Sequence, residues 1–191
     1  MSEQNKKVVV LRGECDGDCG GCYNVAAGEE LSFYQMCGSG DHSLTLRLAE
    51  GAKCHVRTNV RHNVADCKSN QVVKGIAKDN GVGTFDGLVY VAPDAQRTEA
   101  YQQSRNVLLS PTARIQTLPQ LEIYADDVKC SHGATVGQMN EEQIYYMRQR
   151  GLSEEDARKL QLGCFIRQVL DRVDDEALRE EMERLLFPAE R

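Results

Sequence analysis

Alternating apolar and polar positions fill the first 137 residues of the chain. Residues 43–48 alternate strictly, and residues 53–61 place Cys54, Val56, Thr58 and Val60 on one face of an extended segment. Similar short runs recur every ~10–15 residues, with turn signals and no helical pattern between them; they cover residues 8–11, 31–37, 71–76, 88–92, 107–109, 114–118 and 121–125. Evenly spaced short strands predict a sandwich, a barrel or a β-solenoid, and periodicity alone does not choose among the three.

A helical pattern replaces the alternation from residue 138 onward. Asn140 is positioned to cap a first helix, which Gly151 ends, and Ser153-x-x-Asp156 forms the capping box of a second helix. The second helix carries one apolar stripe at helical spacing, made of Leu162, Phe165, Ile166, Val169 and Val173. A third helix is predicted from Asp174 to the stop at Pro188.

The chain therefore divides into two predicted parts, a mainly β core over residues 1–137 and a helical domain over residues 138–191. Residues 152–191 hold eleven acids against seven bases, so they supply four of the six net negative charges. Amphipathic helices appended to a β-body either cap its open end or form a docking face for a partner. The sequence favours neither alternative.

The composition excludes several classes of protein. The chain has 191 residues, a net charge of −6 and no Trp, and this acidic balance argues against general nucleic-acid binding, which needs a basic surface. No apolar run approaches the ~20 residues of a membrane span and no secretory signal is visible, so we expect a cytoplasmic protein. No P-loop or catalytic motif occurs, so we predict that the chain binds no nucleotide itself and is not an enzyme.

Cysteine is the unusual feature of the composition. Three of the eight cysteines lie in Cys15-x3-Cys19-x2-Cys22, flanked by glycines that would let three sulfurs converge on one centre. Thiolates bind zinc or iron–sulfur clusters, so this segment is a candidate metal site. Structural zinc takes four ligands, and Cys37, Cys54 or a histidine would have to complete the set. The other interpretation is a flexible turn with incidental thiols, which the loose spacing slightly favours.

Cys130 and His132 form a second candidate site. On an extended segment the two side chains share a face with Cα atoms about 7 Å apart, so a thiolate and an imidazole could hold one metal or cluster. A nearby imidazolium could also lower the pKa of the thiol. Spacing alone gives this pair little weight, because such a pair often marks only a buried thiol beside a polar edge. Elsewhere we expect His62 to be solvated, and Cys54 and Cys164 to be small core residues.

Residues 119–137, with the sequence PQLEIYADDVKCSHGATVG, resemble the signature region of the SufD branch of the SufB/SufD family of iron–sulfur cluster assembly proteins. The resemblance covers roughly the last hundred residues and extends through 85–91, 106–110, 146–151, 155–160 and 163–165. The Cys-Ser-His-Gly form is similar to SufD rather than to SufB, for which a Glu-His pair is expected at this place.

The resemblance implies a right-handed parallel β-helix followed by a small helical domain. It implies pairing through the β-helix ends, with a SufB-type subunit or with a second copy as a homodimer, and docking of a SufC-type ABC ATPase on the C-terminal helices. The apolar stripe then becomes a candidate for both core packing and the ATPase contact, through Leu162, Phe165, Ile166 and Val169. Cys130 and His132 match the family's Cys and His near the subunit interface, which are implicated in building a nascent, transient iron–sulfur cluster.

Two hypotheses on function follow. The preferred one is a non-enzymatic, SufD-like scaffold subunit that dimerises, docks an ATPase and presents Cys130 and His132. The alternative is a metal- or redox-responsive binding protein that uses Cys15, Cys19 and Cys22 on a β-helix frame. Family members are longer, with an N-terminal helical region and further coils that we expect this short form to lack. The family implies no role for the N-terminal cysteines.

Overall fold

The structure is a computed structural model that describes residues 6–15, 19–25, 30–37, 40–48, 53–171, 176–177, 179–180 and 183. For the strands before residue 53 it describes the backbone alone. Ten strands and two helices follow one another along the chain. The strands are β1 (Lys6–Cys15), β2 (Cys19–Val25), β3 (Glu30–Cys37), β4 (Gly40–Leu48), β5 (Lys53–His62), β6 (Lys68–Ala77), β7 (Val82–Val91), β8 (Glu99–Leu108), β9 (Arg114–Ile123) and β10 (Lys129–Gln138). The helices are α1 (Glu141–Gln149) and α2 (Glu154–Leu170).

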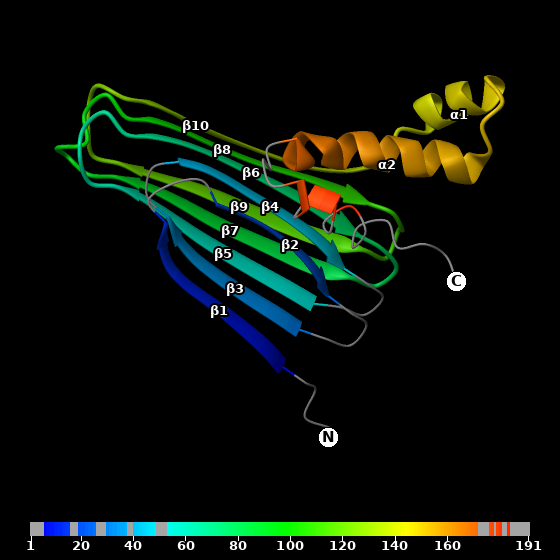
Figure 1. The fold of residues 1–191 in the computed structure, drawn as a ribbon, viewed down its shortest axis with the longest axis horizontal. Coiled ribbons are helices and arrows are strands. Elements are labelled where there is room, and N and C mark those ends of the chain that lie inside the picture. Colours follow the sequence, from blue (N-terminus) through cyan, green and yellow to red (C-terminus); the bar gives the residue numbers. More distant parts are fainter. Residues whose placement is uncertain are drawn as a thin grey trace.

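The strands form two five-stranded sheets in which every ladder is parallel. One sheet has the order β1-β3-β5-β7-β9 and the other β10-β8-β6-β4-β2, so the chain changes sheet after each strand (Figure 1). The mainly β class is confirmed. A chain that returns to the same sheet one coil later is compatible with the predicted β-helix.

Each coil stacks on the previous one with a nearly fixed sequence offset. Glu30 of β3 pairs with Lys53 of β5, an offset of 23 residues, and Val82 of β7 pairs with Arg114 of β9, an offset of 32 residues. Parallel ladders place such register partners about 4.8 Å apart on the same face of a sheet. Residues at equivalent places in successive coils therefore form columns that run along the molecule.

The space between the sheets holds an apolar core interrupted by polar side chains. Val56, Val60 and Val89 are buried on the strands of one sheet. Across from them, the Gln102 Nε2 atom donates a 2.6 Å hydrogen bond to the Gln71 Oε1 atom, and both side chains are buried. Glycines make room for these amides, because a Cβ atom at Gly87 would lie 2.5 Å from the Gln102 Nε2 atom, and one at Gly75 would overlap with the Asn106 side chain.

The helix boundaries follow the capping residues that the sequence predicts. The Asn140 Oδ1 atom accepts a 3.0 Å hydrogen bond from the Gln143 amide, and the Ser153 Oγ atom accepts one of 3.0 Å from the Asp156 amide. Gly151 follows α1 with a φ of 97°, a conformation that glycine adopts without strain. The described residues between 176 and 183 are helical, where a third helix is predicted. Val173 and most of that helix's apolar positions lie outside the described residues.

Helix α2 packs against the outer face of β6 and continues the core to that side of the sheet. Ile166, Val169 and Leu170 form a buried cluster with Val72 and Ile76 of β6, so α2 covers a face of the sheet (Figure 1). Because β10 ends at Gln138 and α1 begins at Glu141, the elements change near the predicted boundary. The division into two domains remains a prediction. None of the described helices is long and apolar enough to cross a membrane.

Candidate functional site

The last strand of each sheet, β9 or β10, pairs on one side only among the described residues. Both edges are long, and each exposes apolar side chains. Leu118 on β9 and Val136 on β10 each keep 42% of their surface exposed, and Ile123 keeps 38%. Long exposed edge strands with apolar side chains are templates for pairing with another chain. This end of the sheets is therefore suited to a contact with a second subunit.

Cys130 and His132 lie on the β10 edge strand, and Ser131 between them places both on the same face. Cys130 is half-buried against the cluster formed by Val60, Val89 and neighbouring residues, whereas His132 is exposed. The register places Cys130 beside Ala100 of β8. The extended backbone assumed for this pair is confirmed, and a thiol and an imidazole thus lie on one face of a free strand edge.

The environment of Cys130 keeps its thiol protonated. Burial raises the pKa of this thiol, and a hydrogen bond with the Ala100 backbone only partly opposes the rise. A thiol must lose its proton to bind a metal, so a cluster component that binds here must displace that proton. In the isolated chain the site is therefore a latent ligand and not a preformed thiolate.

A column of amide side chains runs through the interior to His132. His132 pairs in register with Gln102 of β8, and Gln102 pairs with Gln71 of β6. The Gln102 Oε1 atom is buried and has no hydrogen-bond partner, although its amide nitrogen donates to Gln71. Sequence reasoning missed Gln71 and Gln102, whose only signal is a spacing of 31 and 30 residues within this column.

A row of charges fixes the first residue of β10. The Lys129 Nζ atom lies 3.4 Å from the Glu99 Oε1 atom, and the Lys68 Nζ atom lies 3.6 Å from the Glu99 Oε2 atom. Hydrogen bonding from Lys129 and the charges of both lysines lower the pKa of Glu99. Because the three groups are exposed, we assign this row a role in strand register and little stabilisation.

The backbone does not bring the three N-terminal cysteines to one face. Cys19 and Cys22 lie three residues apart in β2, so they are on opposite faces of the strand. Cys15 pairs in register with Cys37, and Cys19 pairs with His42. Among the residues whose side chains are described, no group of three or more potential ligands is close enough to hold a metal ion.

Two expectations about single residues are wrong and one is confirmed. Cys54 is buried in the core as predicted, and burial raises the pKa of its thiol to about 12. Cys164 is exposed and not a core residue, because α2 presents it away from β6. His62 is 1% exposed and not solvated; its Nε2 atom is 2.8 Å from the Ser69 Oγ atom at a buried corner between the sheets.

The stripe predicted as a docking surface faces the sheet. Ile166 and Val169 are fully buried, and Leu162 and Phe165 are partly buried against the same cluster. Core packing is therefore the role that these four side chains have in the chain, and their contact with an ATPase remains a prediction. The apolar side chains that α1 and α2 expose are different ones, namely Tyr145, Tyr146 and Leu160.

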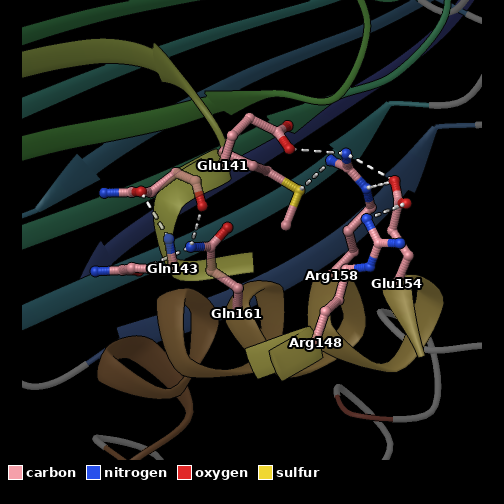
Figure 2. Close-up of polar contacts among 8 residues, drawn as sticks. Glu141, Gln143, Arg148, Glu154, Arg158 and Gln161 are labelled. Atoms are coloured by element: carbon pink, nitrogen blue, oxygen red, sulfur yellow. Dashed lines mark hydrogen bonds and ion pairs between the residues drawn. The ribbon is translucent and has the colours of Figure 1, made fainter. Parts of the chain in front are cut away.

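A network of polar contacts holds α1 against α2 (Figure 2). The Arg158 Nη2 atom is 3.1 Å from the Glu141 Oε2 atom and 3.2 Å from the Glu154 Oε1 atom. Farther along α2, the Gln161 Nε2 atom donates a 2.8 Å hydrogen bond to the Gln143 Oε1 atom. Beside this network a depression of about 460 Å³ opens between the two helices, and its lining includes Tyr146, Met147, Leu160 and Cys164. The two helices therefore present an open apolar surface.

Comparison with known proteins settles the family. Residues 38–165 match the family model described as SUF system FeS cluster assembly, SufBD core domain. The chain belongs to the SufBD family. It is 43% identical over 129 residues to the iron-sulfur cluster assembly protein SufD of Escherichia coli (strain K12), a match that covers 68% of this chain and 30% of that protein.

Two further relatives support this assignment. An iron-sulfur cluster assembly SufBD family protein of Synechocystis sp. (strain ATCC 27184 / PCC 6803 / Kazusa) is 45% identical over 105 residues, which cover 55% of this chain and 23% of that protein. A chloroplastic protein of Arabidopsis thaliana, ABCI7, is 39% identical over 106 residues, which cover 56% of this chain and 22% of that protein. The chain thus spans about a third or less of the length of these SufBD relatives, and it is a SufD-like protein of the SUF system.

Proposed function

We propose that this chain is a non-enzymatic scaffold subunit for iron–sulfur cluster assembly, in which Cys130 and His132 bind the nascent cluster at the contact with a second subunit. The observation that carries this proposal is the position of a thiol and an imidazole on one face of the β10 edge strand. The membership in the SufBD family supports it, since iron and sulfide are then the cargo of the site.

A second subunit is needed because two ligands do not complete a cluster. Iron–sulfur clusters are commonly held by four protein ligands, mostly thiolates. Cys130 and His132 supply two, and among the side chains described no group of three or more ligands forms around them. Pairing of the β9 and β10 edges with a SufB-type subunit or with a second copy would bring the remaining ligands and shield the exposed Leu118 and Val136.

A cluster held by ligands from two subunits is suited to release. When the subunits separate, each chain keeps only part of the ligand set, and the affinity for the cargo falls. The raised pKa of Cys130 acts in the same direction, because the thiol recovers its proton once the metal leaves. The expected partner that drives the separation is a SufC-type ABC ATPase, which would also account for the absence of a P-loop in this sequence.

We place the contact with this ATPase on the exposed surface of α1 and α2. Tyr146 and Leu160 are 60% and 51% exposed and line the depression between the helices. Exposed aromatic and aliphatic side chains around a concave surface are typical anchors of protein contacts. The buried stripe of α2 then contributes indirectly, because its packing on β6 fixes the position of these exposed side chains.

Anaerobic reconstitution with ferrous iron and sulfide tests the cluster site. The variants Cys130→Ala and His132→Ala and the double variant should lose cluster absorbance and bound iron. Cys164→Ala is the matched control, since it removes an exposed thiol from α2 and leaves β10 intact. Equal cluster yield in the double variant and in the wild type would refute the proposed site.

Co-purification with a SufC-type ATPase tests the docking surface. Leu160→Asp and Tyr146→Ala should weaken the complex at least tenfold, whereas Val64→Asp, at an equally exposed site in the β5–β6 loop, should not. Point variants are sharper than deletion of residues 138–191, because deletion would expose the buried side chains of Val72 and Ile76. Undiminished binding by Leu160→Asp would exclude this surface.

A further inference from the structure

Three cysteines and a histidine outside the proposed cluster site lie at one corner of the two sheets. β1 ends at Cys15 and β3 ends at Cys37, so these two residues share the same edge of the first sheet. β2 begins at Cys19, and His42 is the third residue of β4 in the second sheet. The chain passes from the first sheet to the second between Cys15 and Cys19, and again between Cys37 and His42.

The backbone register pairs the four residues within each sheet. Cys15 and Cys37 are Cα partners in the β1–β3 ladder, and Cys19 and His42 are Cα partners in the β2–β4 ladder. Register partners of parallel strands are about 4.8 Å apart on one face of the sheet. Each sheet therefore contributes one adjacent pair of residues to this corner.

Later coils show which face these register positions occupy. Cys37 pairs with Val60, which pairs with Val89, and both valines are buried between the sheets. His42 pairs with Gln71, which pairs with Gln102, and both glutamines are likewise buried. All four residues thus take register positions that face the space between the sheets farther along the molecule.

The same register excludes Cys22 from the group. Cys22 pairs with Thr45 and lies three residues beyond Cys19 in β2, so it is on the opposite face of that strand. The cysteine triplet that the sequence suggests as a ligand set is therefore divided between two faces. Cys37 and His42, which are distant from it in the sequence, take the places beside Cys15 and Cys19.

The chain joins the two columns more directly at this corner than farther along. Three residues separate Cys15 from Cys19, and four separate Cys37 from His42. In the third coil, ten residues separate the equivalent positions Val60 and Gln71. The short connections hold the Cys15–Cys37 pair and the Cys19–His42 pair close to each other across the corner.

We propose that Cys15, Cys19, Cys37 and His42 bind one zinc ion that links the two sheets at this corner. Three thiolates and one imidazole are a complete ligand set for tetrahedral structural zinc. The spacings Cys-x3-Cys and Cys-x4-His match those of short zinc loops. Each thiol releases its proton to solvent when the metal binds, and no electron is transferred.

The zinc site is independent of Cys130 and His132. His42 and His132 belong to one column but to strands β4 and β10, with β6 and β8 between them. Three ladder spacings separate them, about 14 Å. A closed set of four protein ligands leaves no position for substrate, so the zinc ion stabilises the first coils and takes no part in cluster assembly.

Metal analysis of the purified full chain tests the assignment. We expect about one zinc per chain in the wild type, and the same in Cys22→Ser and Cys130→Ser, which serve as matched thiol controls. Cys15→Ser, Cys37→Ser and His42→Ala should retain less than a tenth of this zinc. His42→Cys should restore it, because four thiolates also form a zinc site. This last variant separates loss of a ligand from loss of the fold.

A cobalt titration of the metal-free chain provides a second measurement. Cobalt(II) should develop thiolate charge-transfer absorbance that saturates at about one ion per chain and is weaker in Cys37→Ser. Removal of zinc by a chelator should lower the melting temperature of the wild type and leave that of His42→Ala unchanged. A metal-free wild type, iron in place of zinc, or equal zinc loss in Cys22→Ser would overturn the assignment. Reconstitution at Cys130 would be unaffected by any of these results.

Discussion

Lys74 gives the most direct test of how α2 lies on the sheet. This lysine is on the outer face of β6 and is 2% exposed, with its Nζ atom 4.2 Å from the centre of the Phe165 ring. Burial under α2, and then the charge of Arg105, lowers the pKa of Lys74 from 10.5 to about 8. At pH 7 the folded chain therefore keeps a positive charge in a place that disfavours it.

The replacement Lys74→Met removes the charge and keeps a long apolar side chain. The lowered pKa corresponds to about 3 kcal/mol, because each pKa unit is worth about 1.4 kcal/mol. The Phe165 ring offsets about 1 kcal/mol of this through its interaction with the cation. We therefore expect the free energy of unfolding at pH 7 to rise by about 2 kcal/mol in Lys74→Met.

The pH dependence gives the sign of the effect. Between pH 8 and 10.5 the folded wild type binds fewer protons at Lys74 than the unfolded chain does, so its stability should rise with pH in this window. The penalty is fully present below pH 8 and is lost above 10.5. The advantage of Lys74→Met should therefore shrink across the same window.

Urea unfolding followed by circular dichroism at pH 7 and pH 10 measures both effects. Lys78→Met is the matched control, since its side chain is 63% exposed and belongs to the turn that follows β6. Equal stability of Lys74→Met and the wild type at pH 7, with the same change on going to pH 10, would refute the placement of α2 over Lys74.

Three further predictions concern the interior, the thiols and the strand edges. Gln102→Leu alone should cost about 1–3 kcal/mol in urea unfolding by leaving its buried partner unsatisfied, whereas the double variant with Gln71→Leu should cost less than the sum of the single changes. Iodoacetamide mapping by mass spectrometry should label Cys164 first and Cys54, whose pKa is raised to about 12, only on unfolding; early labelling of Cys54 would contradict its burial. Val136→Lys should weaken subunit pairing in sedimentation experiments, while the equally charged Val64→Lys should not.

Local patterns in the sequence predicted the elements well because their causes are local. The alternation in residues 53–61 corresponds to β5, and the capping residues Asn140 and Ser153 begin the two helices. The same alternation extends one step further to His62, which the sequence interpretation treated as a solvated strand end. His62 is buried because the loop after β5 brings Ser69 beside it.

Features that depend on coil register could not be predicted from local patterns. Gln71 and Gln102 are polar residues that a sequence reading assigns to the surface, and they are buried because each meets its partner one coil away. Cys164 has the opposite error, since the side of α2 that packs on β6 is fixed by the sheet and not by the helix alone. The thiol and imidazole of β10 were correctly paired, because their spacing within one strand needs no register.

The register also separates two kinds of ligand site that look alike in the sequence. At the corner of β1 to β4, the ladders bring together four soft ligands, and a complete set holds a metal permanently. On β10 there are two ligands on a free edge, and the thiol remains protonated until a metal arrives. An incomplete set of this kind binds strongly only while a second subunit completes it, which is what a scaffold needs in order to release its cargo.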